Sequence, residues 1–193
     1  GRVIDQAAAS GLEYVLLTGG EPTLVPHLAD VVRHASSARM QTRVNTNGWK
    51  NKIDYWQELK QAGLDYVAVS VDVSHNSPKI NPSYVPLEKA ADTIEMVIKS
   101  GIQTVVPITP IPIKPYIEQE EEIYRFVVSK LEKLGNGVEL HEGLTEFSIG
   151  SQKHYVELRS GNFINFDGRE KDVLIPNGSK CPSAVDFDAN FFV

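Results

Sequence analysis

Cysteine is nearly absent from the sequence, and this narrows the setting in which the protein works. Only one of the 193 residues is a cysteine, Cys181, so no internal disulfide can form. Structural disulfides are typical of oxidising compartments, and a chain without them fits a reducing one. The sequence therefore predicts a cytoplasmic protein.

Long apolar runs and an excess of positive charge are also missing. No run of about 18 apolar residues occurs, which excludes an ordinary membrane-spanning helix. The chain carries 19 Lys and Arg against 25 Asp and Glu, a net charge of −6. An acidic balance disfavours a broad contact with nucleic-acid phosphates. We therefore expect neither a membrane nor a nucleic acid as a partner.

The first residue is not a methionine, and no signal peptide follows it. Residues 1–11 look like the end of a helix that stops at Gly11, and residues 187–193 end in an apolar run. We therefore expect the chain to be an excised piece of a longer protein.

What the sequence does contain is a regular alternation of predicted strands and helices. Hydrophobic residues make up 41% of the chain and charged residues 23%, as in soluble globular proteins. The expected strands are residues 14–18, 42–48, 64–72, 102–111 and 137–141, and the expected helices are about 28–35, 52–62, 86–100 and 118–134. Strands joined by helices pair in parallel. The predicted fold class is thus α/β, either an open doubly wound sheet or part of a barrel.

This alternation ends near residue 143. Short β-prone runs then alternate with Ser-Gly, Asp-Gly and Asn-Gly turns, a pattern typical of hairpins. The sequence therefore predicts two domains, an α/β barrel-like domain over 1–142 and the start of a β-hairpin-rich extension over 143–193.

Polar residues and glycines follow the first three expected strands. These segments are Thr18-Gly19-Gly20-Glu21-Pro22, Asn45-Thr46-Asn47-Gly48 and Ser70-Val71-Asp72. In parallel α/β folds, ligands bind at the carboxyl ends of the strands. Neutral amides and hydroxyls with a few carboxylates suit a polar small molecule that carries an ammonium group and a sugar.

Each of these segments also has a structural interpretation. Gly19-Gly20 and Asn47-Gly48 are common turn pairs, and Ser70 or Asp72 could cap a helix. The glycines match neither the dinucleotide pattern G-x-G-x-x-G nor a phosphate-binding P-loop. The order of the three segments, each at a strand's end, is what favours a ligand site.

The string LLTGGEPTLVPHL resembles the GGEP element of the radical S-adenosylmethionine (radical SAM) superfamily. RVNTNGW and LDYVAVSVD resemble the next two strands of that family's partial (β/α)6 barrel, so the resemblance covers residues 1 to about 142. It implies that Gly19, Gly20 and Glu21 face the ammonium group of S-adenosylmethionine (SAM), with Pro22 fixing the direction of the loop. It leaves open whether Glu21 touches the ligand or braces the loop. It also implies that four further residues lie around the ribose, the methionyl part or the substrate, namely Asn45, Asn47, Ser70 and Asp72.

The chain departs from the family in one respect. The family's C-x-x-x-C-x-x-C motif, which holds a 4Fe–4S cluster, does not occur in this sequence. We therefore expect this chain to be inactive alone and the cluster ligands to lie in the longer parent. Cys181 is either a small buried residue or, by resemblance to the SPASM/twitch-like extensions of some members, one metal ligand of an auxiliary cluster.

The resemblance implies a radical SAM enzyme as the parent. With its 4Fe–4S cluster it would cleave SAM to a 5′-deoxyadenosyl radical, which takes a hydrogen atom from a small-molecule or peptide substrate. An electron donor such as flavodoxin or ferredoxin would be its partner. No residue receives a catalytic role. Two rivals remain, namely a degenerate barrel that binds a nucleoside-like ligand or acts as a scaffold, and another barrel lyase or hydrolase that uses Glu21 or Asp72 as acid or base.

Overall fold

The computed structural model describes residues 1–79, 81–108, 116–141 and 144–158. Within them one sheet contains the strands β1 (Tyr14–Leu17), β2 (Gln41–Thr46), β3 (Tyr66–Val69), β4 (Gln103–Ile108), β5 (Asn136–His141), β6 (Leu144–Ile149) and β7 (Gln152–Leu158). The helices are α1 (Arg2–Ala9), the 3-10 turn η1 (Pro22–Leu24), α2 (Leu28–Ser37), α3 (Ile53–Gln61), α4 (Val73–Asn76), α5 (Leu87–Lys99) and α6 (Tyr116–Leu131). All five expected strands and all four expected helices form.

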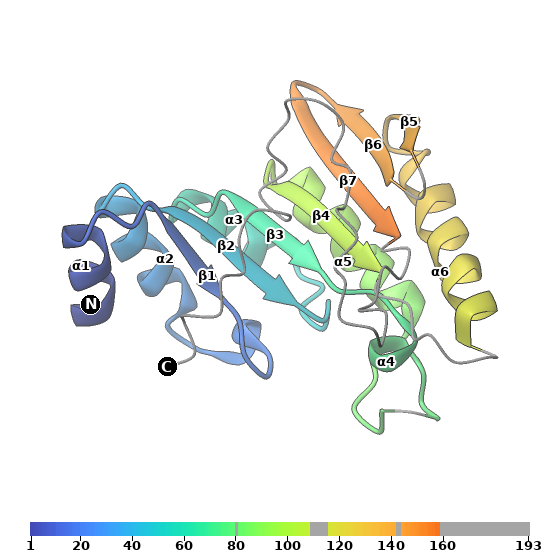
Figure 1. Cartoon of the computed structure of the whole chain (residues 1–193), viewed down its shortest axis with the longest axis horizontal. Helices are drawn as coiled ribbons and strands as arrows, with labels where there is room; N and C mark the ends of the chain where they lie inside the picture. The colour runs from blue at the N-terminus through green and yellow to red at the C-terminus, as the bar shows by residue number, and fades with distance from the viewer. Residues whose placement is uncertain (80, 109–115, 142–143, 159–193) are drawn as a thin grey trace, which may run out of the picture. The chain divides into compact units, whose positions relative to one another are not determined.

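The sheet is mostly parallel, as the alternation predicts. Its strand order is β1-β2-β3-β4-β7-β6-β5, and β1 to β4 and β7 run in parallel (Figure 1). The predicted α/β class is therefore confirmed. In the part of the chain that the structure describes, β1 and β5 are the two ends of the strand order, so the sheet is open there.

The prediction of parallel pairing is wrong for the fifth strand. β5 forms where expected, but it pairs antiparallel with β6, and β7 takes the place beside β4. The connections explain this, because only a few residues separate β5, β6 and β7, whereas parallel neighbours need a long crossover. The sheet thus continues past residue 142. Residues 159–193 lie outside the described residues, and the predicted extension over 143–193 stays a prediction.

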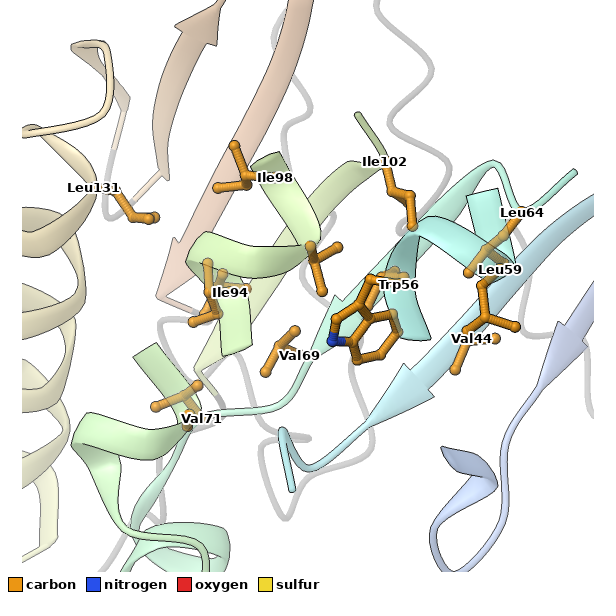
Figure 2. Close-up of a cluster of buried hydrophobic side chains, with 14 of the residues drawn as sticks. Val44, Trp56, Leu59, Leu64, Val69, Val71, Ile94, Ile98, Ile102 and Leu131 are labelled. Carbon is orange, nitrogen blue, oxygen red and sulfur yellow. The ribbon is translucent and has the colours of Figure 1, made fainter. Parts of the chain in front are cut away.

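A row of helices covers one face of the sheet and forms the core with it. α2 contacts β2 and α3, α5 contacts β3, β4 and α3, and α6 contacts β4 and β7. Trp56 of α3 is fully buried in this layer beside Val44 and Leu59, as Figure 2 shows. Its indole Nε1 donates to the Lys50 backbone oxygen at 2.8 Å, which satisfies the one polar atom of the ring.

Side chains of β2 and β3 alternate between this core and the opposite face of the sheet. Val44 aligns with Val67, and both are fully buried in the core. Arg43 and Asn45 flank Val44 and so point to the other face. This alternation separates the apolar support of β2 from the polar groups near its carboxyl end.

Within the described ranges, none of the helices combines the length and the apolar character that a bilayer crossing requires. The cytoplasmic location stays a prediction.

Candidate functional site at the strand ends

A cavity of ≈ 840 Å³ opens at the carboxyl ends of β1, β2 and β3. We call it the strand-end cavity. Its lining includes most of the predicted site residues, namely Gly19, Gly20, Glu21, Asn45, Asn47 and Ser70, together with Thr18 and Thr46. Segments up to about fifty positions apart in the sequence thus meet at one edge of the sheet. Their roles toward a ligand stay predictions.

The two glycines after β1 differ in what they require. Gly19 has φ of +141°, in the region where only glycine is unstrained. Gly20 has no such φ, and a Cβ built on it would meet no protein atom within 4 Å. The space in front of Gly20 therefore belongs to the cavity, and the fold alone does not demand glycine there.

The carboxylate of Glu21 ties the end of β1 to the end of β2. Its Oε1 accepts hydrogen bonds from Thr23 N at 3.0 Å, Thr23 Oγ1 at 2.6 Å and Thr46 Oγ1 at 2.8 Å. Its Oε2 accepts from Asn47 N at 2.8 Å. These four donors fill about as many sites as a carboxylate offers. Glu21 therefore braces the loop and brings a negative charge to the cavity wall, while its contact with a ligand stays a prediction.

The turn after β2 is held from behind by α5. Gly48 has φ of +80°, and a Cβ there would lie 3.2 Å from Ala90 Cα, so glycine is required twice over. Its oxygen accepts from Thr93 Oγ1 at 2.7 Å. Asn47 turns its Oδ1 to Trp49 N at 2.9 Å, a local turn that fixes the side chain at the rim.

Replacing Thr93 by valine tests this support. Thr93 is fully buried, so valine keeps its shape but leaves the Gly48 oxygen without its donor. We expect the free energy of unfolding in urea to fall by about 1–2 kcal/mol. Thr93→Ser, which keeps the hydroxyl, is the matched control and should fall by less. Equal stability of the valine variant and the wild type would contradict the proposed support.

Asn45, on the face opposite the core, is oriented by its neighbour two positions before it. Arg43 Nε donates to Asn45 Oδ1 at 2.9 Å, and Arg43 is only 7% exposed. Tyr14 of β1 lies near the same guanidinium. Burial raises the pKa of the Tyr14 hydroxyl, although the charge of Arg43 and a hydrogen bond from it oppose the rise. The buried guanidinium of Arg43 thus contacts Asn45, which lines the cavity.

Ser70 and Asp72 end up in different places. Ser70 lines the cavity, and its backbone N donates to Thr46 O at 2.9 Å. Asp72 is 4% exposed, is not among the lining residues and caps α4, accepting from His75 N at 3.0 Å, His75 Nδ1 at 2.8 Å and Ser74 Oγ at 2.5 Å. Burial pushes the pKa of Asp72 up, but these hydrogen bonds and the His75 charge outweigh it and lower the pKa below its usual value. Asp72 is therefore an ionised capping residue.

Two further predicted site residues do not line the cavity. Pro22 is buried as the first residue of η1, behind the loop whose direction it fixes. Cys181 lies outside the described residues, so its predicted metal-ligand role stays a prediction. Across the described ranges, no group of three or more His, Cys, Asp or Glu side chains is arranged to hold a metal ion.

Sequence reasoning missed the outer wall of the cavity. The lining also includes Leu24, Trp49, His75, Asn81, Pro82, Ser83 and Tyr84. The Asn81-Pro82-Ser83 turn signal marks a loop, but no pattern says that this loop returns over the strand ends. Trp49 ends the segment RVNTNGW, and the sequence pattern assigns it no role. It is 46% exposed, and Lys89 Nζ lies 3.3 Å from its ring centroid, a cation–π contact that holds the ring at the rim.

A family model described as "Radical SAM superfamily" matches residues 1–127, more than half of the chain. The chain belongs to the radical SAM superfamily. The resemblance carried by GGEP, TNG and S-x-D is thereby confirmed, and the named relatives of this radical SAM chain include enzymes such as cyclases and dehydratases.

Two curated relatives and one solved structure define how far this likeness extends. An "S-adenosylmethionine-dependent nucleotide dehydratase" from Lacinutrix mariniflava is 36% identical over 115 residues, 54% of this chain and 24% of the relative. A "GTP 3',8-cyclase" from Synechococcus elongatus is 42% identical over 72 residues, 36% of this chain and 22% of the relative. SuiB from Streptococcus suis, solved "bound to S-adenosylmethionine", matches with a TM-score of 0.53 and 19% identity, over 67% of this chain and 30% of SuiB.

The similarity to SuiB shows the fold alone. This radical SAM chain spans less than a third of each of the three proteins. Ligands, substrates and activity therefore enter below as proposals.

Proposed function

We propose that the strand-end cavity binds SAM, and that the complete protein is a radical SAM enzyme that removes a hydrogen atom from a substrate held against the same edge of the sheet. The observation that carries this proposal is the meeting of Gly19-Gly20-Glu21, Asn45–Asn47 and Ser70 around one cavity in a chain of this superfamily.

The residues present fit the chemical groups of SAM. The Glu21 charge and the open backbone at Gly20 suit the ammonium group, because charge-assisted contacts are favourable there and no Cβ intervenes. The amide and hydroxyl groups of Asn45, Asn47 and Ser70 suit the ribose and the methionyl carboxylate. When SAM is bound and reduced by one electron, it supplies the carbon radical that takes the hydrogen atom. The protein groups position the ligand and keep water out.

The chain does not fit a 4Fe–4S cluster. Such a cluster takes several cysteine thiolates, and the sequence contains one cysteine. No step through a cluster is therefore assigned to residues of this chain, and neither the electron donor nor the substrate class is derived from it. We propose that both belong to the complete protein, as the family resemblance implies.

The hydrogen bonds of the two carboxylates favour this proposal over the barrel lyase or hydrolase. Glu21 and Asp72 are each held by internal donors, and the pKa of Asp72 is lowered, which makes it a poor proton acceptor near neutral pH. A general base would instead need a lone pair directed at a substrate.

Gly20→Ala tests the ligand position. An added methyl group meets no protein atom within 4 Å, so the melting temperature should not change. If the backbone of Gly20 lies against SAM, the methyl group should weaken SAM binding by about tenfold, an ordinary cost of overpacking. Both quantities are measured on the complete cluster-loaded protein, by thermal unfolding and by isothermal titration calorimetry.

Gly101→Ala is the matched control. Gly101 precedes β4, at the amino end of that strand and therefore away from the strand-end cavity. It has φ of +75° with open space around it. It should lower the melting temperature through backbone strain and leave SAM affinity unchanged. Unchanged affinity of Gly20→Ala, or a wild type that does not bind SAM, would overturn the proposed site.

A further inference from the structure

The strand-end cavity has two walls of different chemistry. The inner wall, residues 18–21, 45–47 and 70, presents backbone and small polar groups and is the proposed SAM site. The outer wall carries larger side chains, among them Leu24, Trp49 and Tyr84. The cavity volume of ≈ 840 Å³ is near the upper end of the usual range for small-molecule sites, about 300–1,000 Å³. The proposed function requires a substrate in addition to SAM, and the outer wall is the part of the lining that remains for it.

Trp49 is the largest side chain of the outer wall, and much of its ring is exposed. It is 46% exposed, whereas Trp56, the other tryptophan of the sequence, is fully buried. Lys89 Nζ lies 3.3 Å from the Trp49 ring centroid and so covers one face of the ring. The exposed surface therefore belongs to the other face and to the ring edges. Leu24, which is 64% exposed, adds apolar surface to the same lining. Apolar surface gathered in a cavity is typical of ligand sites.

The segment that carries the polar groups of the outer wall is fastened to α4. Val85 N donates to the backbone oxygen of His75 at 2.9 Å, and Asn76 Nδ2 donates to Val85 O at 2.8 Å. Asn81 Oδ1 accepts from Ser83 N at 2.9 Å, which holds the Asn81 amide in a local turn. The amide of Asn81 and the hydroxyl of Ser83 both line the cavity, so each can hydrogen-bond to the edge of a polar ring.

These features favour one class of ligand. An exposed indole face binds planar rings by stacking, and aromatic side chains commonly bind nucleobases in this way. The ammonium group of Lys89 brings a positive charge to the same ring. It has three donors, so it can also pair with a phosphate that extends past the ring edge. A neutral aliphatic substrate would use neither the indole face nor the charge.

We propose that the outer wall of the strand-end cavity is the substrate subsite and that it binds a nucleotide, with the base stacked on Trp49 and a phosphate beside Lys89. This inference rests on the proposed function, in which SAM occupies the inner wall. It names a class of substrate for that function, and it makes Trp49 and Lys89 the residues that select this class.

Trp49→Ala is the decisive variant. The probes are the four common ribonucleoside triphosphates, titrated one at a time into the complete cluster-loaded protein by isothermal titration calorimetry. S-adenosylhomocysteine, an unreactive relative of SAM, fills the inner wall. The wild type should bind at least one triphosphate with a Kd below about 1 mM, and Trp49→Ala should weaken that binding by about tenfold or more.

Two further variants show whether the aromatic face is what matters. Trp49→Phe keeps an aromatic ring and should lose less affinity than Trp49→Ala. Ile53→Ala is the matched control. Ile53 is apolar and 37% exposed like Trp49, but it is not among the residues that line the cavity, so its truncation should leave nucleotide affinity unchanged.

Lys89→Met tests the phosphate contact, because methionine keeps an unbranched apolar chain and removes the charge. It should weaken binding of the triphosphate by about tenfold and binding of the nucleoside with the same base by less than about threefold. Lys99→Met is the matched control. Lys99 lies on the same helix, α5, and pairs with Glu95, so its loss should change neither affinity.

The outcomes separate this inference from the proposed function. If the wild type does not bind SAM, the proposed function fails, and titration of nucleotides without S-adenosylhomocysteine still tests the outer wall. If the wild type binds SAM but none of the four triphosphates, or if Trp49→Ala keeps wild-type nucleotide affinity, the substrate assignment is wrong. It is also wrong if Trp49→Ala weakens SAM as strongly as the nucleotide, because the ring then belongs to the SAM site.

Both variants should fold, since neither Trp49 nor Lys89 belongs to the core cluster. Circular dichroism checks this for each protein. If Trp49→Ala did not fold, the comparison of triphosphate with nucleoside in Lys89→Met would decide, and equal weakening of the two, or of neither, would overturn the assignment.

Discussion

Glu21→Gln should weaken SAM binding by the complete protein by about a hundredfold. The substitution removes the negative charge, and it also replaces the oxygen that accepts from Asn47 N by a donor nitrogen. The amide oxygen can still accept from Thr23 and Thr46, but the amide nitrogen then faces Asn47 N. Two donors that face each other leave the Asn47 N–H without an acceptor. The free energy of unfolding should fall by about 1–3 kcal/mol for this half-buried group.

Glu13→Gln is the matched control for this change. Glu13 precedes β1 and is exposed, so the same chemical substitution should alter neither stability nor affinity. Urea unfolding gives the first quantity and isothermal titration calorimetry the second. If Glu21→Gln lost stability but kept wild-type affinity, the brace would be real and its role in SAM binding would be wrong.

The meeting of the three strand-end segments could be predicted from the sequence because it follows from topology. Once β1, β2 and β3 pair in parallel, their carboxyl ends share one edge, wherever the segments lie in the chain. Gly19, Asn45 and Ser70 are placed together by that rule alone. No side-chain detail is needed for this step.

The roles of the two carboxylates could not be predicted in the same way. Glu21 and Asp72 both follow strands whose carboxyl ends form the predicted ligand site, and by position either could contact a ligand. Their roles differ because different donors lie nearby. Glu21 accepts from Thr46 and Asn47, at the end of a different strand, whereas Asp72 accepts from His75, three residues later in the chain. The capping role of Asp72 was an alternative in the sequence, and the structure selects it.

The alternation of strands and helices also could not predict that β7 pairs with β4. The alternation identifies β5 correctly, but strand order depends on which neighbour buries more apolar surface and on the length of each connection. Val156 and Phe147 are fully buried in the core through β7 and β6. Those side chains stabilise an order that local periodicity does not specify.

His154 of β7 should make the protein sensitive to mild acid. Its side chain is 1% exposed, its Nδ1 accepts from Thr104 N at 3.2 Å, and its Nε2 has no partner within the described residues. Burial lowers the pKa of His154 to about 4. The folded chain therefore keeps this ring neutral at a pH where an unfolded chain has protonated it.

The sign of the effect follows from the two pKa values. Above the unfolded value of about 6.5, both states hold the neutral ring and His154 has no effect on the pH dependence. Below it the unfolded state binds a proton that the folded state does not, so stability falls with decreasing pH until the folded pKa of about 4 is reached. The loss across this window amounts to about 3 kcal/mol.

His154→Asn isolates this contribution. Asparagine keeps an oxygen near the position of Nδ1, which can still accept from Thr104 N, and it does not titrate. The variant should be less stable than the wild type at pH 7, because a smaller side chain leaves a cavity, and the gap should narrow by about 3 kcal/mol as the pH falls to 4. Urea unfolding at intervals between these limits measures the gap. A gap between His154→Asn and the wild type that stays constant with pH would mean that His154 binds its proton at the same pH in the folded and the unfolded chain, and would contradict the lowered pKa.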